Sequence, residues 1–171
     1  NMTEKEYRKD IRFMKRYGTK EWVNIDNFIK EQLQKNPDLT IHVGTDSQYC
    51  NGVSHYVTVV ALRFAKKGVI GLYNPSKFDV KGKPVDYVGR RRKRRRSGSN
   101  NGIKDKDIEA ITRRLRKETE LTMEIAYYLH STCQIPIETI DLDYNSDDGL
   151  EKDDSTDNTD TSNKKEIPIY L

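Results

Sequence analysis

The chain has 171 residues, of which 34% are hydrophobic and 34% are charged, and its formal net charge is +4. Its apolar runs fall short of the ~18–20 residues that a membrane-spanning helix needs, which excludes a helical membrane protein. The only two cysteines, Cys50 and Cys133, exclude a disulfide-stabilised scaffold. No apolar signal segment follows the first residues, so we expect a cytoplasmic, intracellular protein.

The small net charge hides two segments of opposite charge. Residues 141–160 contain nine acidic residues and one lysine, a charge of −8, so the other 151 residues carry +12. Residues 90–96 read Arg-Arg-Arg-Lys-Arg-Arg-Arg and supply +7 of that charge. This composition indicates that part of the chain packs into no hydrophobic core.

Residues 2–38 are predicted to form an N-terminal helical segment. Thr3 and Glu6 have the spacing of a capping box, and apolar residues then recur at helical intervals as far as Gly18. A second helix is predicted over residues 20–35, because the following Asn-Pro pair disfavours helix. The apolar positions of the two helices are Tyr7, Ile11 and Met14, and then Trp22, Ile25, Ile29 and Leu33.

From Leu39 onward the pattern changes to that of β-strands. Asn51-Gly52 indicates a hairpin turn, since both residues tolerate positive φ, and Lys-Lys-Gly at 66–68 indicates a second turn. Three consecutive antiparallel strands are predicted, over residues 39–46, 53–65 and 69–73.

The rest of the sequence alternates between polar segments and predicted elements. Residues 74–104 lack an apolar period and are predicted to form a long insertion, which contains the basic septet. A helix over 105–131 and a strand over 137–144 complete a core that spans residues 39–144. Residues 145–166 are acidic and are expected to be disordered, and 167–171 resemble the start of a C-terminal element that is cut short.

Glu118 interrupts the apolar face of the predicted helix. Burial of a bare carboxylate is costly, so such a group is normally paired, protonated or bound to a metal. A partly exposed edge position and a buried ion pair with an arginine are the ordinary alternatives. The inward positions, three or four residues apart, are Ile111, Leu115, Glu118, Thr122, Ile125 and Leu129.

Two aspartates stand out in the predicted strands. Asp46 ends an apolar strand among small hydroxyl residues, where a carboxylate is well placed to bind a hard cation. Asp143 shares one face of the fourth strand with Asp141. The ordinary interpretations are a solvated turn residue for Asp46 and a polar strand edge for Asp143.

The order of these residues along the chain predicts an α/β fold with a mixed sheet. Three antiparallel strands would be followed by a helix that crosses over the sheet, and the fourth strand would lie beside the first. Asp46, Glu118 and Asp143 would then lie side by side and repel one another unless divalent cations neutralise them. Two Mg²⁺ or Mn²⁺ ions ~3.5–4 Å apart form the arrangement that cleaves phosphodiesters.

These residues resemble motifs of the ribonuclease H-like superfamily. The sequence is most similar to a bacterial and phage family whose first strand carries Gly-Thr-Asp-Ser-Gln, as residues 44–48 do. The family's helix motif resembles residues 118–127, its next strand resembles Asp-Tyr-Asn at 143–145, and a downstream segment resembles Ser-Asn-Lys at 162–164. The resemblance extends from about Leu39 to Lys164.

The resemblance implies a ribonuclease H-like core and a carboxylate-bound two-metal site that holds Mg²⁺ or Mn²⁺. The catalytic and metal-binding residues that it implies are Asp46, Glu118 and Asp143. The superfamily usually places a fourth acidic residue on a C-terminal helix, which this sequence does not reach.

The basic septet predicts a nucleic-acid partner, RNA or DNA, bound through its phosphates in a salt-dependent manner. A nuclear-import-like signal and a solvated loop that faces the acidic segment are the alternatives. The septet consists of Arg90, Arg91, Arg92, Lys93, Arg94, Arg95 and Arg96.

Three functions are consistent with these patterns. The first is a metal-dependent nuclease that acts on RNA, an RNA/DNA hybrid or structured DNA. The second is a catalytically inactive nucleic-acid-binding module of the same fold, and the third is a structural or partner-binding protein.

Overall fold

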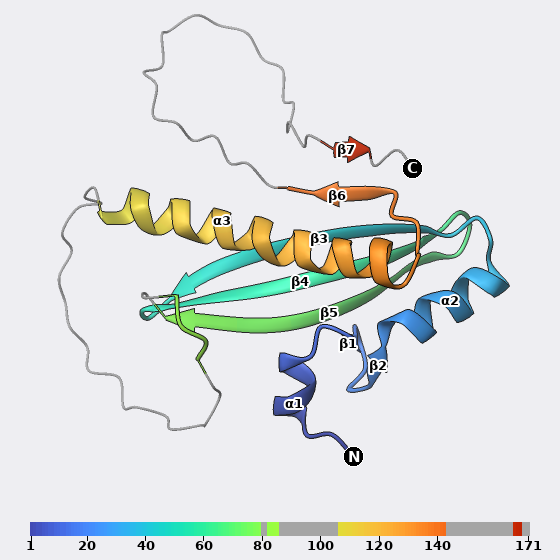
Figure 1. Ribbon diagram of the computed structural model, residues 1–171, viewed down its shortest axis with the longest axis horizontal. Coiled ribbons are helices and arrows are strands. Elements are labelled where there is room, and N and C mark those ends of the chain that lie inside the picture. Colours follow the sequence, from blue (N-terminus) through green and yellow to red (C-terminus); the bar gives the residue numbers. More distant parts are fainter. Residues whose placement is uncertain (80–81, 86–105, 143–165, 169–171) are drawn as a thin grey trace, which may run out of the picture.

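A mixed β-sheet organises the described part of the chain, and the long helix α3 crosses one of its faces (Figure 1). The computed structural model describes residues 1–79, 82–85, 106–142 and 166–168. Within them, seven strands lie in the order β2-β1-β5-β4-β3-β6-β7. The elements in chain order are α1 (Glu4–Lys9), β1 (Phe13–Arg16), β2 (Trp22–Asn24), α2 (Ile25–Lys35), β3 (Thr40–Cys50), β4 (Val53–Phe64), β5 (Gly68–Asp79), α3 (Lys106–Tyr127), the π-helical turn η1 (Tyr128–Thr132), β6 (Thr139–Asp141) and β7 (Glu166–Pro168).

The predicted antiparallel strands form the centre of the sheet. β3 pairs with β4 and β4 pairs with β5, both antiparallel. Asn51 and Gly52 have φ values of 52° and 79°, as the predicted hairpin turn requires. After the α3 crossover, β6 returns parallel to β3 and lies beside it. The predicted α/β arrangement, with the fourth strand beside the first, is therefore confirmed.

The helix α3 packs by the predicted face along its C-terminal part. Glu118, Thr122 and Ile125 of α3 are buried, as is Leu129 of η1, and the core continues from them to α2. The prediction was wrong for Ile111, which is 45% exposed. No helix among the described residues is long and apolar enough to span a bilayer.

The N-terminal helices are shorter than predicted, and two strands lie between them. Helix α1 ends at Lys9. The next residue, Asp10, leaves helical geometry, and its carboxylate accepts hydrogen bonds from the guanidinium of Arg12. Met14, expected on a helix, lies buried in β1. Helix α2 begins at Ile25 rather than near residue 20, because Asn24 caps it. Strands β1 and β2 therefore extend the sheet beyond β5.

Strand β5 reaches Asp79, so the predicted insertion does not begin at residue 74. Residues 82–85 turn back against the end of β5, where the backbone N–H of Val85 donates to the Lys77 carbonyl at 2.9 Å. Residue 166 was predicted to end the acidic segment, and 167 to begin a C-terminal element. Residues 166–168 instead form one strand, β7, which pairs antiparallel with β6. The basic septet and residues 143–165 lie outside the described residues.

Candidate functional site

Glu118 is buried between α3 and the sheet, with 8% of its surface exposed. The hydroxyl of Ser47, in β3, donates a hydrogen bond to its Oε1. Ser47 follows Asp46 directly in the sequence. Helix α3 therefore places Glu118 beside the strand motif at residues 44–48. Glu118 contacts Ser47 of that motif and not Asp46.

A row of hydroxyl groups continues from Glu118 along the interface between α3 and the sheet. Thr122, one helical turn later, donates to Thr45 Oγ1 at 2.8 Å, and Thr45 donates to Thr58 Oγ1 at 3.3 Å. These residues are buried. Because buried polar groups need partners, this row fixes how α3 sits over β3 and β4.

Tyr56 is a second buried residue near Glu118. It lies opposite Ser47 in the β3–β4 register and is 4% exposed. Burial raises the pKa of Tyr56, and the charge of Glu118 adds to that increase. The phenol therefore keeps its proton at neutral pH and can act as a hydrogen-bond donor but not as a base.

Asp46 occupies the opposite face of β3 and lies within the strand, which continues to Cys50 in register with β4 instead of ending at Asp46 as predicted. Side chains alternate along a strand, so Asp46 points away from Ser47 and from α3 and is exposed. Its Oδ1 accepts a hydrogen bond from the backbone N–H of Ser47 at 2.8 Å. The structure thus brings Glu118 next to the strand motif but does not place it on the same face as Asp46.

Asp141, which was predicted only to share a strand face with Asp143, is a further carboxylate beside the strand motif. Asp141 pairs with Gly44 across the parallel β3–β6 ladder, on the face that carries Asp46. A Cβ atom on Gly44 would lie 3.3 Å from the Cβ atom of Asp141. The glycine therefore leaves space for this carboxylate, and no local sequence pattern marks the pairing of the two residues.

His42 joins the same two strands two residues before Gly44. Its Nδ1 lies 2.6 Å from Thr139 Oγ1, and its Nε2 lies 2.9 Å from Thr40 Oγ1. Both ring nitrogens are therefore engaged by hydroxyl groups. The histidine supports the β3–β6 pair below the carboxylates and leaves no nitrogen for a metal.

The carboxylates meet the needs of a hard cation only in part. Asp46 and Asp141 supply the oxygen donors that Mg²⁺ and Mn²⁺ prefer, whereas Glu118 lies on the other face. Within the described residues, no group of three or more His, Cys, Asp or Glu side chains is placed to hold a metal ion. Asp143, the third predicted ligand, lies outside those residues.

No protein-family model, no curated protein and no solved structure matches this chain.

Proposed function

We propose that the chain is a metal-dependent nuclease of ribonuclease H-like fold that hydrolyses phosphodiester bonds in RNA, an RNA/DNA hybrid or structured DNA. One observation carries the proposal. Asp46 and Asp141 lie on one face of two adjacent parallel strands, where β6 ends at Asp141 and β3 continues past Asp46 to Cys50. The carboxyl ends of adjacent parallel strands are where α/β sheets commonly bind ligands.

Asp46 and Asp143 are the proposed metal ligands, and the geometry adds Asp141 to the candidates. Glu118, the remaining ligand expected from the sequence, lies on the α3 face of β3, where it contacts Ser47. A bound divalent cation would supply activation of water and neutralisation of charge on the phosphate. The chain's own part is to hold the carboxylates in place. Gly44 leaves space for Asp141, and the backbone of Ser47 orients Asp46.

The basic septet is the proposed contact with the substrate backbone. Seven adjacent cations attract a polyanion whatever its base sequence, as a nuclease of low sequence preference requires. The strong positive charge outside residues 141–160 supports the same partner.

The test is cleavage of labelled RNA, hybrid and branched DNA with Mg²⁺ or Mn²⁺. We expect Asp46→Asn and Asp143→Asn each to lower the rate at least about a hundredfold, because each removes a proposed ligand. Asp38→Asn, an exposed aspartate outside the site, is the matched control and should cleave like wild type. Equal rates for wild type and Asp46→Asn would contradict the metal-site assignment.

The inactive nucleic-acid-binding module is the second candidate, and one observation favours it. Asp46 and Glu118 lie on opposite faces of β3, and Ser47 already engages Glu118. This function predicts nucleic-acid binding that falls steeply with salt and is the same in EDTA and in Mg²⁺. Glu118→Gln should then leave binding unchanged, as should the exposed control Glu120→Gln on the same helix.

A further inference from the structure

A cavity of about 560 Å³ lies between α1, β5 and α3, apart from the candidate carboxylates. Asp46, Glu118 and Asp141 are not among the residues that line it. Its volume falls within the range of small-molecule sites, roughly 300–1,000 Å³. The cavity is therefore large enough for a metabolite-sized ligand.

The walls of the cavity combine an apolar part with a cationic part. Met14, Phe78 and Ile125 contribute to the apolar part. The ring of Phe78 is itself held in place by an edge contact with Tyr56, at 5.5 Å between centroids. Such a wall suits a flat, apolar ring.

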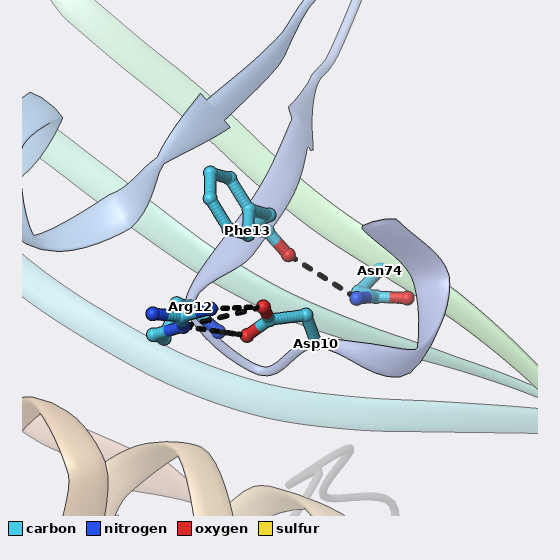
Figure 2. Close-up of polar contacts among 4 residues, drawn as sticks. All are labelled: Asp10, Arg12, Phe13 and Asn74. Atoms are coloured by element: carbon cyan, nitrogen blue, oxygen red, sulfur yellow. Dashed lines mark hydrogen bonds and ion pairs between the residues drawn. The ribbon is translucent and has the colours of Figure 1, made fainter. Parts of the chain in front are cut away.

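Two buried polar atoms in the wall have no hydrogen-bond partner within the described residues, Oδ1 of Asn74 and Oγ of Ser76. The side-chain amide of Asn74 donates to the carbonyl of Phe13 at 3.2 Å (Figure 2). That bond orients the amide, so Oδ1 points away from Phe13 (Figure 2). Buried polar atoms are rarely left unbonded, so these two atoms indicate a ligand with hydroxyl or amine groups.

The cationic part of the wall comes from α1 and β5. Lys5, Arg8 and Lys9 of α1 line the cavity together with Lys77, against two lining glutamates, Glu4 and Glu124. Burial lowers the pKa of Lys77, and the positive charge of Arg8 lowers it further. Arg8 also forms an ion pair with Glu4 at 3.2 Å. The four lining cations still exceed the two lining glutamates, so this wall favours an anion.

We propose that this cavity binds a small organic monophosphate that carries an aromatic ring and hydroxyl groups, the chemical class of nucleoside monophosphates. The phosphate would lie against the cations of α1, the ring against the apolar wall, and the hydroxyls near Asn74 and Ser76. The inference does not rest on the proposed nuclease function, because among the described residues the two sites share no side chain.

The test is calorimetric titration of the full chain with AMP, with adenosine and with inorganic phosphate. AMP should bind one to one, and adenosine and phosphate should each bind at least about tenfold more weakly, because each lacks one half of the contacts. Arg8→Gln should weaken AMP binding about tenfold, the size expected for a lost charge-assisted hydrogen bond.

Arg12→Gln is the matched control. Arg12 pairs with Asp10 (Figure 2), and it is not among the residues that line the cavity. Ser76→Ala tests the polar wall without a change in charge and should also weaken AMP binding. Replacement of residues 90–96 by glutamines, or Asp46→Asn, should leave AMP binding unchanged. The proposal is overturned if AMP does not bind, if phosphate binds as tightly as AMP, or if Arg8→Gln and Arg12→Gln have equal effects. Loss of AMP binding in the septet variant but not in Arg8→Gln would overturn it as well.

Discussion

A methyl group on Gly44 would lie 3.3 Å from the Cβ atom of Asp141, whereas one on Gly71 would lie 3.5 Å from the Cβ atom of Tyr17. Both glycines sit in strands, and neither has a positive φ. Replacement of such a glycine by alanine normally stabilises a protein by roughly 0.4–1 kcal/mol. The tighter contact at Gly44 should cancel that gain.

We therefore expect Gly44→Ala to have a free energy of unfolding about 1 kcal/mol lower than Gly71→Ala. Urea unfolding of the two variants measures the difference. If both variants gain the same stability, β6 yields to the methyl group and Gly44 is not needed for the position of Asp141.

Tyr128 gives a prediction about alkaline pH. The pKa of Tyr128 is raised from 10.0 to about 12. Burial is the main cause, and the hydrogen bond with Cys133 is the second. A raised folded-state pKa contributes stability that is complete below pH 10 and is lost as the pH rises through about 12. Phenolate absorbance should show one tyrosine that ionises near pH 12, and Tyr128→Phe should remove that step. A titration with every tyrosine near pH 10 would contradict the burial of this phenol.

The residues of the candidate site differ in how far the sequence could predict them. Glu118 was predictable because a helical face has a fixed period, and a carboxylate in that face is visible as an exception. Asp141 was not singled out, because its role depends on which residue of β3 lies opposite to it. That register depends on the whole crossover and leaves no local pattern.

Helix α1 has only six residues, too few to be stable by itself. It is held by Tyr7, which stacks on Trp22 at 5.3 Å and meets Phe13 edge-on at 5.1 Å. The tyrosine thereby joins α1 to both N-terminal strands. The helix itself ends at Lys9, where Asp10 leaves helical geometry.

Tyr7→Ala should release α1 from the sheet, at a cost of about 2 kcal/mol from lost burial and aromatic contacts. Hydrogen exchange should show faster exchange in residues 4–9 and unchanged protection in β3 and β4. Tyr17→Ala is the control, because Tyr17 is 79% exposed. Unchanged protection of α1 in Tyr7→Ala would show that other contacts hold the helix.

Strands β3 and β4 were predictable from alternation and from the Asn-Gly turn, but the length of β5 was not. Pro75 normally interrupts a central strand. Within the described part of the chain, β1 pairs with Leu72 and Tyr73 of β5 only. From Asn74 onward β5 therefore has an outer edge in that part of the sheet, where proline is allowed. The sequence shows the proline but not the position of the strand in the sheet.

At the scale of the whole molecule, charge is the property that the sequence describes most completely. The septet and the acidic segment lie outside the described residues, yet their charges follow from the sequence alone. The cavity, by contrast, is formed by residues from α1, β5 and α3 that share no motif. It could only be found in the folded chain.

Replacement of the seven basic residues 90–96 by glutamines should weaken single-stranded nucleic-acid binding at low salt. The slope of log affinity against log salt should decrease by up to about 5, since each neutralised phosphate contributes about 0.7. A Lys66→Gln and Lys67→Gln double variant, in the exposed β4–β5 turn, controls for a general loss of positive charge. An unchanged slope in the septet variant would show that nucleic acid binds elsewhere.

The outer edge of β5 also has a consequence for how the protein behaves at high concentration. A long strand edge with free N–H and C=O groups can recruit a strand of another molecule and start aggregation. Here Pro75 offers no N–H, and residues 82–85 occupy backbone groups of Lys77 and Asp79. The fold thus leaves little of this edge of β5 available to an intermolecular sheet, and strand addition is disfavoured there.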